Sequence, residues 1–128
     1  MKVYVAARTS DRKEVKKLNK LLRQEGFEVL DWTWHKNTKP YDKHKKLAKE
    51  YSVEDIGNIK RADVFILMTN GVPGLGSTTE LGVALASFEL TKKPKIYVVG
   101  EYTETNMFYF HPAVSLRKSV EKVIREIK

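Results

Sequence analysis

The sequence predicts an α/β protein in which a parallel sheet of four to five strands has helices on both faces. Three observations support this fold class. Short apolar segments rich in β-branched residues alternate with longer amphipathic ones, helix-start or glycine signals follow the strand-like segments, and residues 63–70 have a continuous apolar centre. Parallel neighbours need crossover connections, which helices supply and which are nearly always right-handed.

Each element has its own local signal. Residues 2–7 predict the first strand, and the helix-start residues 9–11 follow it. The next helix keeps an apolar face and ends at Gly26; that face consists of Val15, Leu18, Leu21 and Leu22. The later predicted elements are a strand at 27–34, a helix from about 42 to 62, a strand at 63–70, a glycine loop at 71–76, a helix from about 78 to 90, a strand at 95–100, a short fifth strand within 107–114, and a terminal helix marked by Leu116, Val120, Val123, Ile124 and Ile127.

Composition limits the function classes. A chain of 128 residues and 14.8 kDa predicts one domain spanning 1–128. The absence of cysteine excludes disulfides, thiolate metal sites and cysteine nucleophiles. No apolar run is long enough to span a bilayer and no signal-peptide pattern opens the chain, so we expect a cytoplasmic protein without membrane association.

The net charge of +8 is concentrated in the first half of the chain. Residues 1–50 carry 14 Lys/Arg and 7 Asp/Glu, whereas residues 51–128 carry 10 and 9. This excess suits a phosphorylated small molecule or a nucleic acid, but it is equally the solvated face of a helix.

The glycine loop indicates a ligand crevice without identifying a nucleotide motif. It lacks the lysine of a phosphate-binding P-loop and the third glycine of a dinucleotide fingerprint, so we expect no cofactor. Gly74 and Gly76 allow a ligand to approach the backbone, and Ser77 and Thr78 open a helix whose free N–H groups suit polar or anionic groups.

Two acidic residues are candidates for glycosidic chemistry. Glu80 follows the third strand, and Asp55 lies in the preceding helical segment. Each also fits a capping box, in Ser77-Thr78-Thr79-Glu80 and Ser52-Val53-Glu54-Asp55, so a purely structural role remains open. If the two carboxyl groups share one crevice, one can attack the anomeric carbon while the other, protonated, serves as the acid for the leaving group.

Other side chains carry weaker signals. Tyr4 lies inside the first strand, where packing is its ordinary role. Arg8, Thr9 and Ser10 follow that strand at a helix start, which suits an anion or a plain cap.

Aromatic and imidazole side chains are also ambiguous. Trp32 and Trp34 point to one face of the second strand and can stack on a base or belong to the core or a subunit interface. The three histidines, His35, His44 and His111, lack metal-ligand spacing, so we expect no metal site.

With these residues in view, the chain resembles the nucleoside 2-deoxyribosyltransferase family, including the related 2′-deoxynucleoside 5′-monophosphate N-hydrolases. Three segments carry the resemblance: 3–7 with Ser10-Asp11-Arg12, the run Asp55-Ile56-Gly57-Asn58-Ile59-Lys60-Arg61-Ala62-Asp63, and the run 74–86, Gly-Leu-Gly-Ser-Thr-Thr-Glu-Leu-Gly-Val-Ala-Leu-Ala, with Lys93-Pro94 beyond it. Order and spacing agree throughout.

The resemblance implies a flavodoxin-like or Rossmann-like three-layer sandwich and an N-glycosidase or deoxyribosyltransferase. It implies that Glu80 is the nucleophile, that Asp55 protonates the departing base, and that Tyr4 orients Glu80. It further implies a homodimer or a dimer of dimers, with residues 108–111 as a candidate segment contributed to the neighbouring site.

The chain departs from the family where the 5′ end of the substrate binds. The transferases place an acid there and the N-hydrolases a serine, but the matching position falls near Gly74, which has neither group. Arg8, Arg12, Ser77 and the basic first half favour a 5′-monophosphate over a free nucleoside. Hydrolysis and transfer both remain open, and a non-catalytic nucleotide-binding module or a basic nucleic-acid-binding protein is a less favoured alternative.

Overall fold

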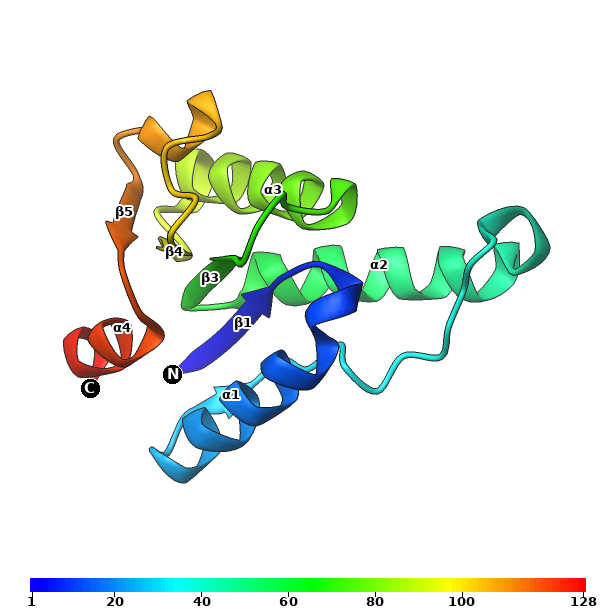
Figure 1. Ribbon diagram of the computed structural model, residues 1–128, viewed down its shortest axis with the longest axis horizontal. Helices are drawn as coiled ribbons and strands as arrows, with labels where there is room; N and C mark the ends of the chain where they lie inside the picture. The colour runs from blue at the N-terminus through cyan, green and yellow to red at the C-terminus, as the bar shows by residue number, and fades with distance from the viewer.

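The computed structural model describes residues 1–128 and has a parallel five-stranded sheet at its centre, in the order β2-β1-β3-β4-β5 (Figure 1). The strands are β1 (Lys2–Ala6), β2 (Glu28–Val29), β3 (Val64–Thr69), β4 (Lys95–Gly100) and β5 (Val114–Arg117). Every neighbouring pair is parallel. The predicted flavodoxin-like α/β class is therefore confirmed.

Four α-helices cover the two faces of the sheet (Figure 1). The helices are α1 (Arg12–Gln24), α2 (Lys45–Arg61), α3 (Leu75–Thr91) and α4 (Val120–Ile127). Helices α1 and α4 lie on one face, where Lys128 forms an ion pair with Glu25, and α2 and α3 pack together on the other. No helix is both long enough and apolar enough to cross a membrane.

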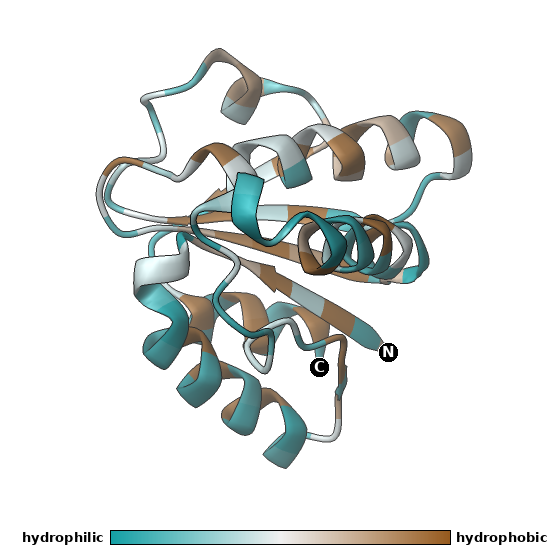
Figure 2. Cartoon of the chain, turned by 90° about the vertical axis from the view of Figure 1, so that its right-hand side faces the viewer, coloured by the Kyte–Doolittle hydropathy of each residue, from teal (hydrophilic) through white to brown (hydrophobic).

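The core runs through the three central strands. Tyr4, Phe65 and Ile66 are fully buried, and Figure 2 shows hydrophobic residues concentrated in the strands while the outer side of α1 is hydrophilic. Helices on both faces remove the need for an alternating strand pattern, which is why β3 is apolar on both sides.

The topology predicts a ligand site beyond the carboxyl ends of β1 and β3. These strands are neighbours in the sheet, yet β1 continues into α1 on one face and β3 into α3 on the other. Ligands of open parallel sheets bind at such a point, beyond the carboxyl ends of the strands.

Two predicted strands differ from the structure. The strand predicted at 27–34 is limited to Glu28–Val29, because the Asp31 carboxylate accepts hydrogen bonds from the backbone N–H and hydroxyl of Thr33 and turns the chain. The fifth strand is Val114–Arg117, whereas the prediction placed it within 107–114. Residues Met107–Phe110 form a 3₁₀ turn instead, and the Asn106 side chain accepts a hydrogen bond from the Phe108 N–H at its start.

Two predicted helices begin elsewhere. Helix α2 starts at Lys45, after a separate 3₁₀ turn at Tyr41–Lys43. Helix α3 starts at Leu75 instead of about 78, since the Gly74 carbonyl accepts from the N–H and hydroxyl of Thr78 and from the hydroxyl of Ser77. Glu80 therefore lies in the second turn of α3, and the capping box predicted there is wrong.

Candidate active site

A hydrogen bond between β1 and α3 fixes Glu80. Tyr4 lies on the face covered by α2 and α3, fully buried, with its ring stacked on Phe65 at a centroid distance of 6.0 Å. Its hydroxyl donates a short hydrogen bond to Oε2 of Glu80. The Glu80 carboxylate thus faces the sheet instead of folding back onto Ser77.

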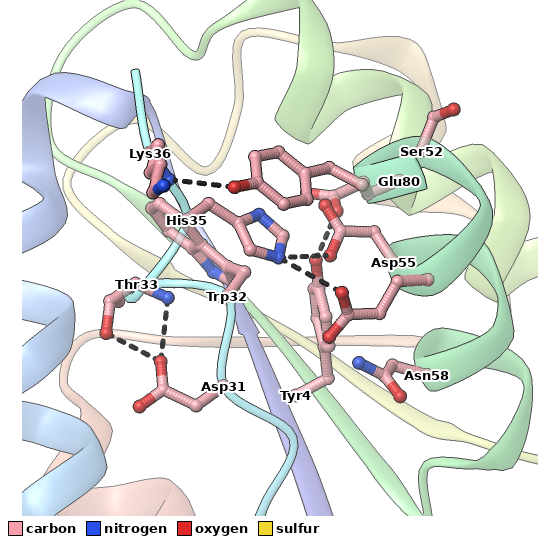
Figure 3. A network of polar contacts seen from close by, with 12 residues as sticks. Tyr4, Asp31, Trp32, Thr33, His35, Lys36, Ser52, Asp55, Asn58 and Glu80 are labelled. Atoms are coloured by element: carbon pink, nitrogen blue, oxygen red, sulfur yellow. Dashed lines mark hydrogen bonds and ion pairs between the residues drawn. The ribbon is translucent and has the colours of Figure 1, made fainter. Parts of the chain in front are cut away.

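Asp55 reaches the same place from α2. Figure 3 shows Asp55, Glu80 and the end of the Tyr4 side chain turned toward one another. The predicted capping box at 52–55 is wrong as well, because these residues lie inside α2 and the Ser52 hydroxyl donates to the Lys49 carbonyl at 2.9 Å. The fold therefore brings together the three residues that the sequence singled out for chemistry.

Burial raises the pKa of both carboxyl groups to a similar value, and their polar neighbours act on the two pKa values in opposite directions. Burial raises the pKa of Glu80 to about 7, with the Tyr4 hydrogen bond acting in the opposite direction and the Asp55 charge adding to the rise. Burial also raises the pKa of Asp55 to about 7, and the neighbouring Glu54 charge adds to it. Tyr4 thus favours the ionised form of Glu80, whereas Glu54 favours the protonated form of Asp55.

Tyr4 itself remains a donor. Burial raises the pKa of the Tyr4 phenol far above its ordinary value, and the charges of Glu80 and Asp55 raise it further. The phenol is therefore protonated throughout the physiological range and always offers its hydrogen to Glu80.

His35, Tyr51 and Glu54 also lie at this site, although no sequence pattern singled them out for chemistry. His35 is buried, its ring stacks on Tyr51 with a centroid distance of 3.8 Å, and its Nε2 lies 3.5 Å from Oε2 of Glu54 and 3.9 Å from Oδ1 of Asp55. The available signals were the position of His35 beyond the second strand and the adjacency of Glu54 to Asp55. No group of three His, Asp or Glu side chains is arranged to hold a metal ion.

Arg8 joins the loop after β1 to the glycine loop. Its guanidinium pairs with Asp11 at 3.0 Å and donates to the Asn70 carbonyl at 2.6 Å. A Cβ added to Gly71, whose φ is +108°, would lie 3.1 Å from Nη1 of Arg8, and one added to Gly74 would lie 3.6 Å from its Cγ. Glycine at these positions therefore leaves room for the arginine side chain.

The other predicted binding residues lie in the loop after β1 and around the start of α3, where Ser77 is buried. Thr9 and Ser10 are exposed, and the Thr9 hydroxyl accepts a hydrogen bond from Nζ of Lys39 at 3.4 Å. Gly76 is exposed with open space around it. The hydroxyl hydrogens of Ser77 and Thr78 are already used within α3, as described above, so their remaining capacity is to accept.

The two tryptophans do not share a role. Trp32 is buried and its indole N–H donates to the Val5 carbonyl at 2.6 Å, so it belongs to the core. Trp34 is 58% exposed beside His35 and Tyr51. The expectation that both rings point to one face is therefore wrong, and only Trp34 has a surface free for stacking.

No protein-family model and no curated protein sequence matches the chain. A solved structure of Clostridium botulinum CMP N-glycosidase, BcmB, is similar to it, with a TM-score of 0.58 and 19% identity over 99% of this chain and 98% of that one. The two chains share a fold. The similarity extends over nearly the whole of both chains.

The raised pKa of Glu80 should make the unfolding free energy depend on pH. The pKa of Glu80 is higher in the folded state than its ordinary value of 4.5, so the protonated form stabilises the fold below about pH 4 and this contribution is lost as the pH rises through about 7. We expect Glu80→Gln, which cannot ionise, to exceed the wild type in unfolding free energy at pH 8 by on the order of 2 kcal/mol.

Thermal or urea unfolding between pH 4 and pH 8 measures this difference. Glu101→Gln, at an exposed position, serves as the matched control and should follow the wild type at every pH. Identical pH dependence in Glu80→Gln and the wild type would show that Glu80 carries no burial penalty.

Proposed function

We propose that the protein cleaves the N-glycosidic bond of a nucleoside 5′-monophosphate, with Glu80 as the nucleophile, Asp55 as the general acid and Tyr4 as the residue that orients Glu80. The observation that carries this proposal is the buried Glu80 carboxylate, which accepts the Tyr4 hydrogen bond beside a second carboxyl group that favours its proton. A retaining glycosidase needs this combination of one ionised and one protonated carboxyl group.

The fold comparison supports the reaction class. The structural neighbour is described as a CMP N-glycosidase, and it spans the same length of chain as this protein. The three segments that resemble the nucleoside 2-deoxyribosyltransferases contain Tyr4, Asp55 and Glu80 in the same order. Local sequence and overall fold thus favour the same chemistry independently.

The reaction proceeds in two displacements. Glu80 attacks the anomeric carbon, the bond from carbon to the base nitrogen breaks, and the base takes the Asp55 proton as its electron pair returns to nitrogen. Water then attacks the glycosyl ester and gives a proton to the Asp55 carboxylate, which restores both residues. A second base can replace water as the acceptor, which would make the reaction a transfer.

We assign the phosphate of the substrate to the basic loop after β1. Arg8 is fixed beside the glycine loop, and Thr9, Ser10 and Lys39 lie on the exposed rim next to it. We assign this rim, with Gly74, Gly76, Ser77 and Thr78 at the start of α3, to the 5′ end of the substrate. Charge-assisted contacts of this kind favour a phosphate over a hydroxyl.

Replacing Glu80 should stop base release. Wild-type protein is incubated with deoxynucleosides, ribonucleosides and their 5′-monophosphates, with and without a second base, and free base is measured by chromatography. We expect Glu80→Gln to lose roughly 10⁴-fold in rate, since the covalent step disappears while the fold remains. Glu101→Gln should retain full activity.

The results separate the alternatives. Equal base release by Glu80→Gln and the wild type would contradict the proposed nucleophile. Release from no substrate, combined with thermal stabilisation by a nucleotide, would indicate a binding module instead of an enzyme.

Replacing Asp55 should make the rate depend on how well the base leaves. Asp55→Asn cannot donate a proton, and loss of a general acid costs roughly 10²- to 10⁴-fold. A fluorinated form of the preferred base leaves more readily as an anion. With a substrate that carries this base, the rate should fall much less in Asp55→Asn. Steady-state rates for the two substrates measure this difference; an equal loss for both would contradict the acid role.

We further propose a homodimer in which the 3₁₀ turn Met107–Phe110 contributes to the interface. Met107, Phe108 and Phe110 are 76%, 54% and 60% exposed, an apolar group that a monomer rarely leaves in water. Sedimentation velocity should show a dimer for the wild type and a shift toward monomer for Phe108→Ser. A monomeric wild type at the same concentration would contradict this assignment.

A further inference from the structure

Two buried polar atoms face each other beside the proposed active site, and neither has a hydrogen-bond partner. They are Nε2 of His35 and Oδ1 of Asp55, separated by 3.9 Å. Buried polar groups are almost always satisfied, so an unpaired donor and an unpaired acceptor at this separation call for a functional explanation. Figure 3 shows the His35 ring turned so that Nε2 points toward the carboxyl groups of α2.

The His35 ring is held in this orientation from several sides. Its plane is parallel to that of Tyr51, whose hydroxyl accepts from the Lys36 N–H at 3.1 Å, and Trp34 contacts its edge at a centroid distance of 4.6 Å. The His35 carbonyl also accepts a hydrogen bond from Arg12. Little entropy therefore remains to be lost when Nε2 takes a partner.

We propose that His35 is a positioning residue for the general acid, donating its Nε2 hydrogen to Oδ1 of Asp55 once Asp55 has passed its proton to the leaving base. This inference rests on the proposed function, because it assigns His35 a role through Asp55. The bond that forms holds the new carboxylate in place, ready to accept a proton from the attacking water. No additional reactant is required.

The tautomer follows from the surroundings of the ring. Burial lowers the pKa of His35, against the opposing charge of Glu54, so the imidazole is neutral at pH 7 and carries one N–H. Both atoms that face Nε2 belong to carboxyl groups, which accept hydrogen bonds when ionised. The hydrogen therefore belongs on Nε2.

Asp55 gains more from this hydrogen than Glu54 does. The Glu54 side chain is 37% exposed to solvent, whereas Oδ1 of Asp55 is buried without a partner. Once ionised, Asp55 also faces the charge of Glu80 from α3 and the Tyr4 phenol from β1. A neutral donor stabilises the Asp55 carboxylate without adding a second charge to this group.

The remaining charges near His35 come from other elements. Arg12 of α1 lowers the pKa of the imidazole and Asp31, beyond β2, raises it. Arg12 and Asp31 do not adjoin Asp55, whereas His35 and Glu54 do. Because His35 is neutral, replacing it with another uncharged side chain changes the hydrogen bonding of Asp55 more than the charges around it.

Two uncharged substitutions separate the hydrogen bond from the ring. His35→Phe keeps an aromatic ring to stack on Tyr51 but removes the donor, whereas His35→Gln loses the ring and keeps an amide N–H close to the position of Nε2. The pH profile of kcat for base release is measured for both variants, with thermal unfolding to show that each is folded.

We expect the alkaline limb, which reports Asp55, to move up by about one pH unit in His35→Phe and to stay near the wild-type position in His35→Gln. The reason is that loss of the donor destabilises the Asp55 carboxylate. An alkaline limb at the wild-type pH in His35→Phe would overturn the proposal. A limb that moves up in His35→Gln, which lacks the ring, and not in His35→Phe, which lacks the donor, would overturn it as well.

A second measurement does not depend on turnover. Carbon-13 NMR of the labelled Asp carboxyl groups, with the Asp55 signal assigned by its loss in Asp55→Asn, gives the pKa of Asp55 in each protein. A higher pKa of Asp55 in His35→Phe than in the wild type and His35→Gln supports the contact, and equal values in all three refute it. If the wild type releases no base, the proposed function fails while this titration still decides the His35 contact.

Discussion

The hydrogen bond from Tyr4 to Glu80 is the constraint around which the site is arranged. It joins the first strand to the third helix, across 76 positions of the sequence, and it lies under the layer formed by α2 and α3. A carboxylate at this depth is tolerated only with a partner, because burial without a hydrogen bond opposes its charge. Tyr4 is the partner, and the parallel pairing of β1 with β3 places it there.

The same burial that destabilises the charge on Glu80 gives that residue its proposed reactivity. An exposed glutamate is ionised and well hydrated at neutral pH, and hydration reduces its reactivity as a nucleophile. Here the Tyr4 bond keeps the ionised form accessible, while Glu54 makes ionisation of Asp55 harder. Two carboxyl groups with similar pKa values thereby have neighbours that act on them in opposite directions, as the two proposed roles require.

Sequence patterns revealed the fold and the three central residues, but they failed where side chains override the local pattern. The apolar run of β3 and the helix periodicities were sufficient for the α/β class, since burial on both faces leaves a clear signature. Residues 27–34 looked like one strand because periodicity cannot reveal that the Asp31 side chain captures the Thr33 N–H. The capping pattern before Glu80 was misleading because Gly74, with no side chain to cap, begins the helix three residues early.

His35 was beyond sequence reasoning for a related reason. Its importance depends on a stack with Tyr51, 16 positions away, and on a gap of 3.9 Å to Asp55, and neither contact leaves a spacing rule in the chain. Histidines are usually examined for metal-ligand spacing, and His35 has none. A buried side chain with an unsatisfied nitrogen becomes visible only after the fold has placed its neighbours.

The distribution of charge connects the site with its proposed substrate. The protein carries a net charge of +8, yet three carboxyl groups, those of Glu54, Asp55 and Glu80, lie together at the candidate site. Positive charge at the rim acts over the Debye length of roughly 10 Å and attracts a phosphate, whereas the buried carboxyl groups act only at contact distances. Under the proposed function, a nucleotide would approach with its phosphate end first, and its sugar and base would enter toward Glu80 and Asp55. The basic loop and the carboxyl groups would therefore orient the proposed substrate together, which neither could do alone.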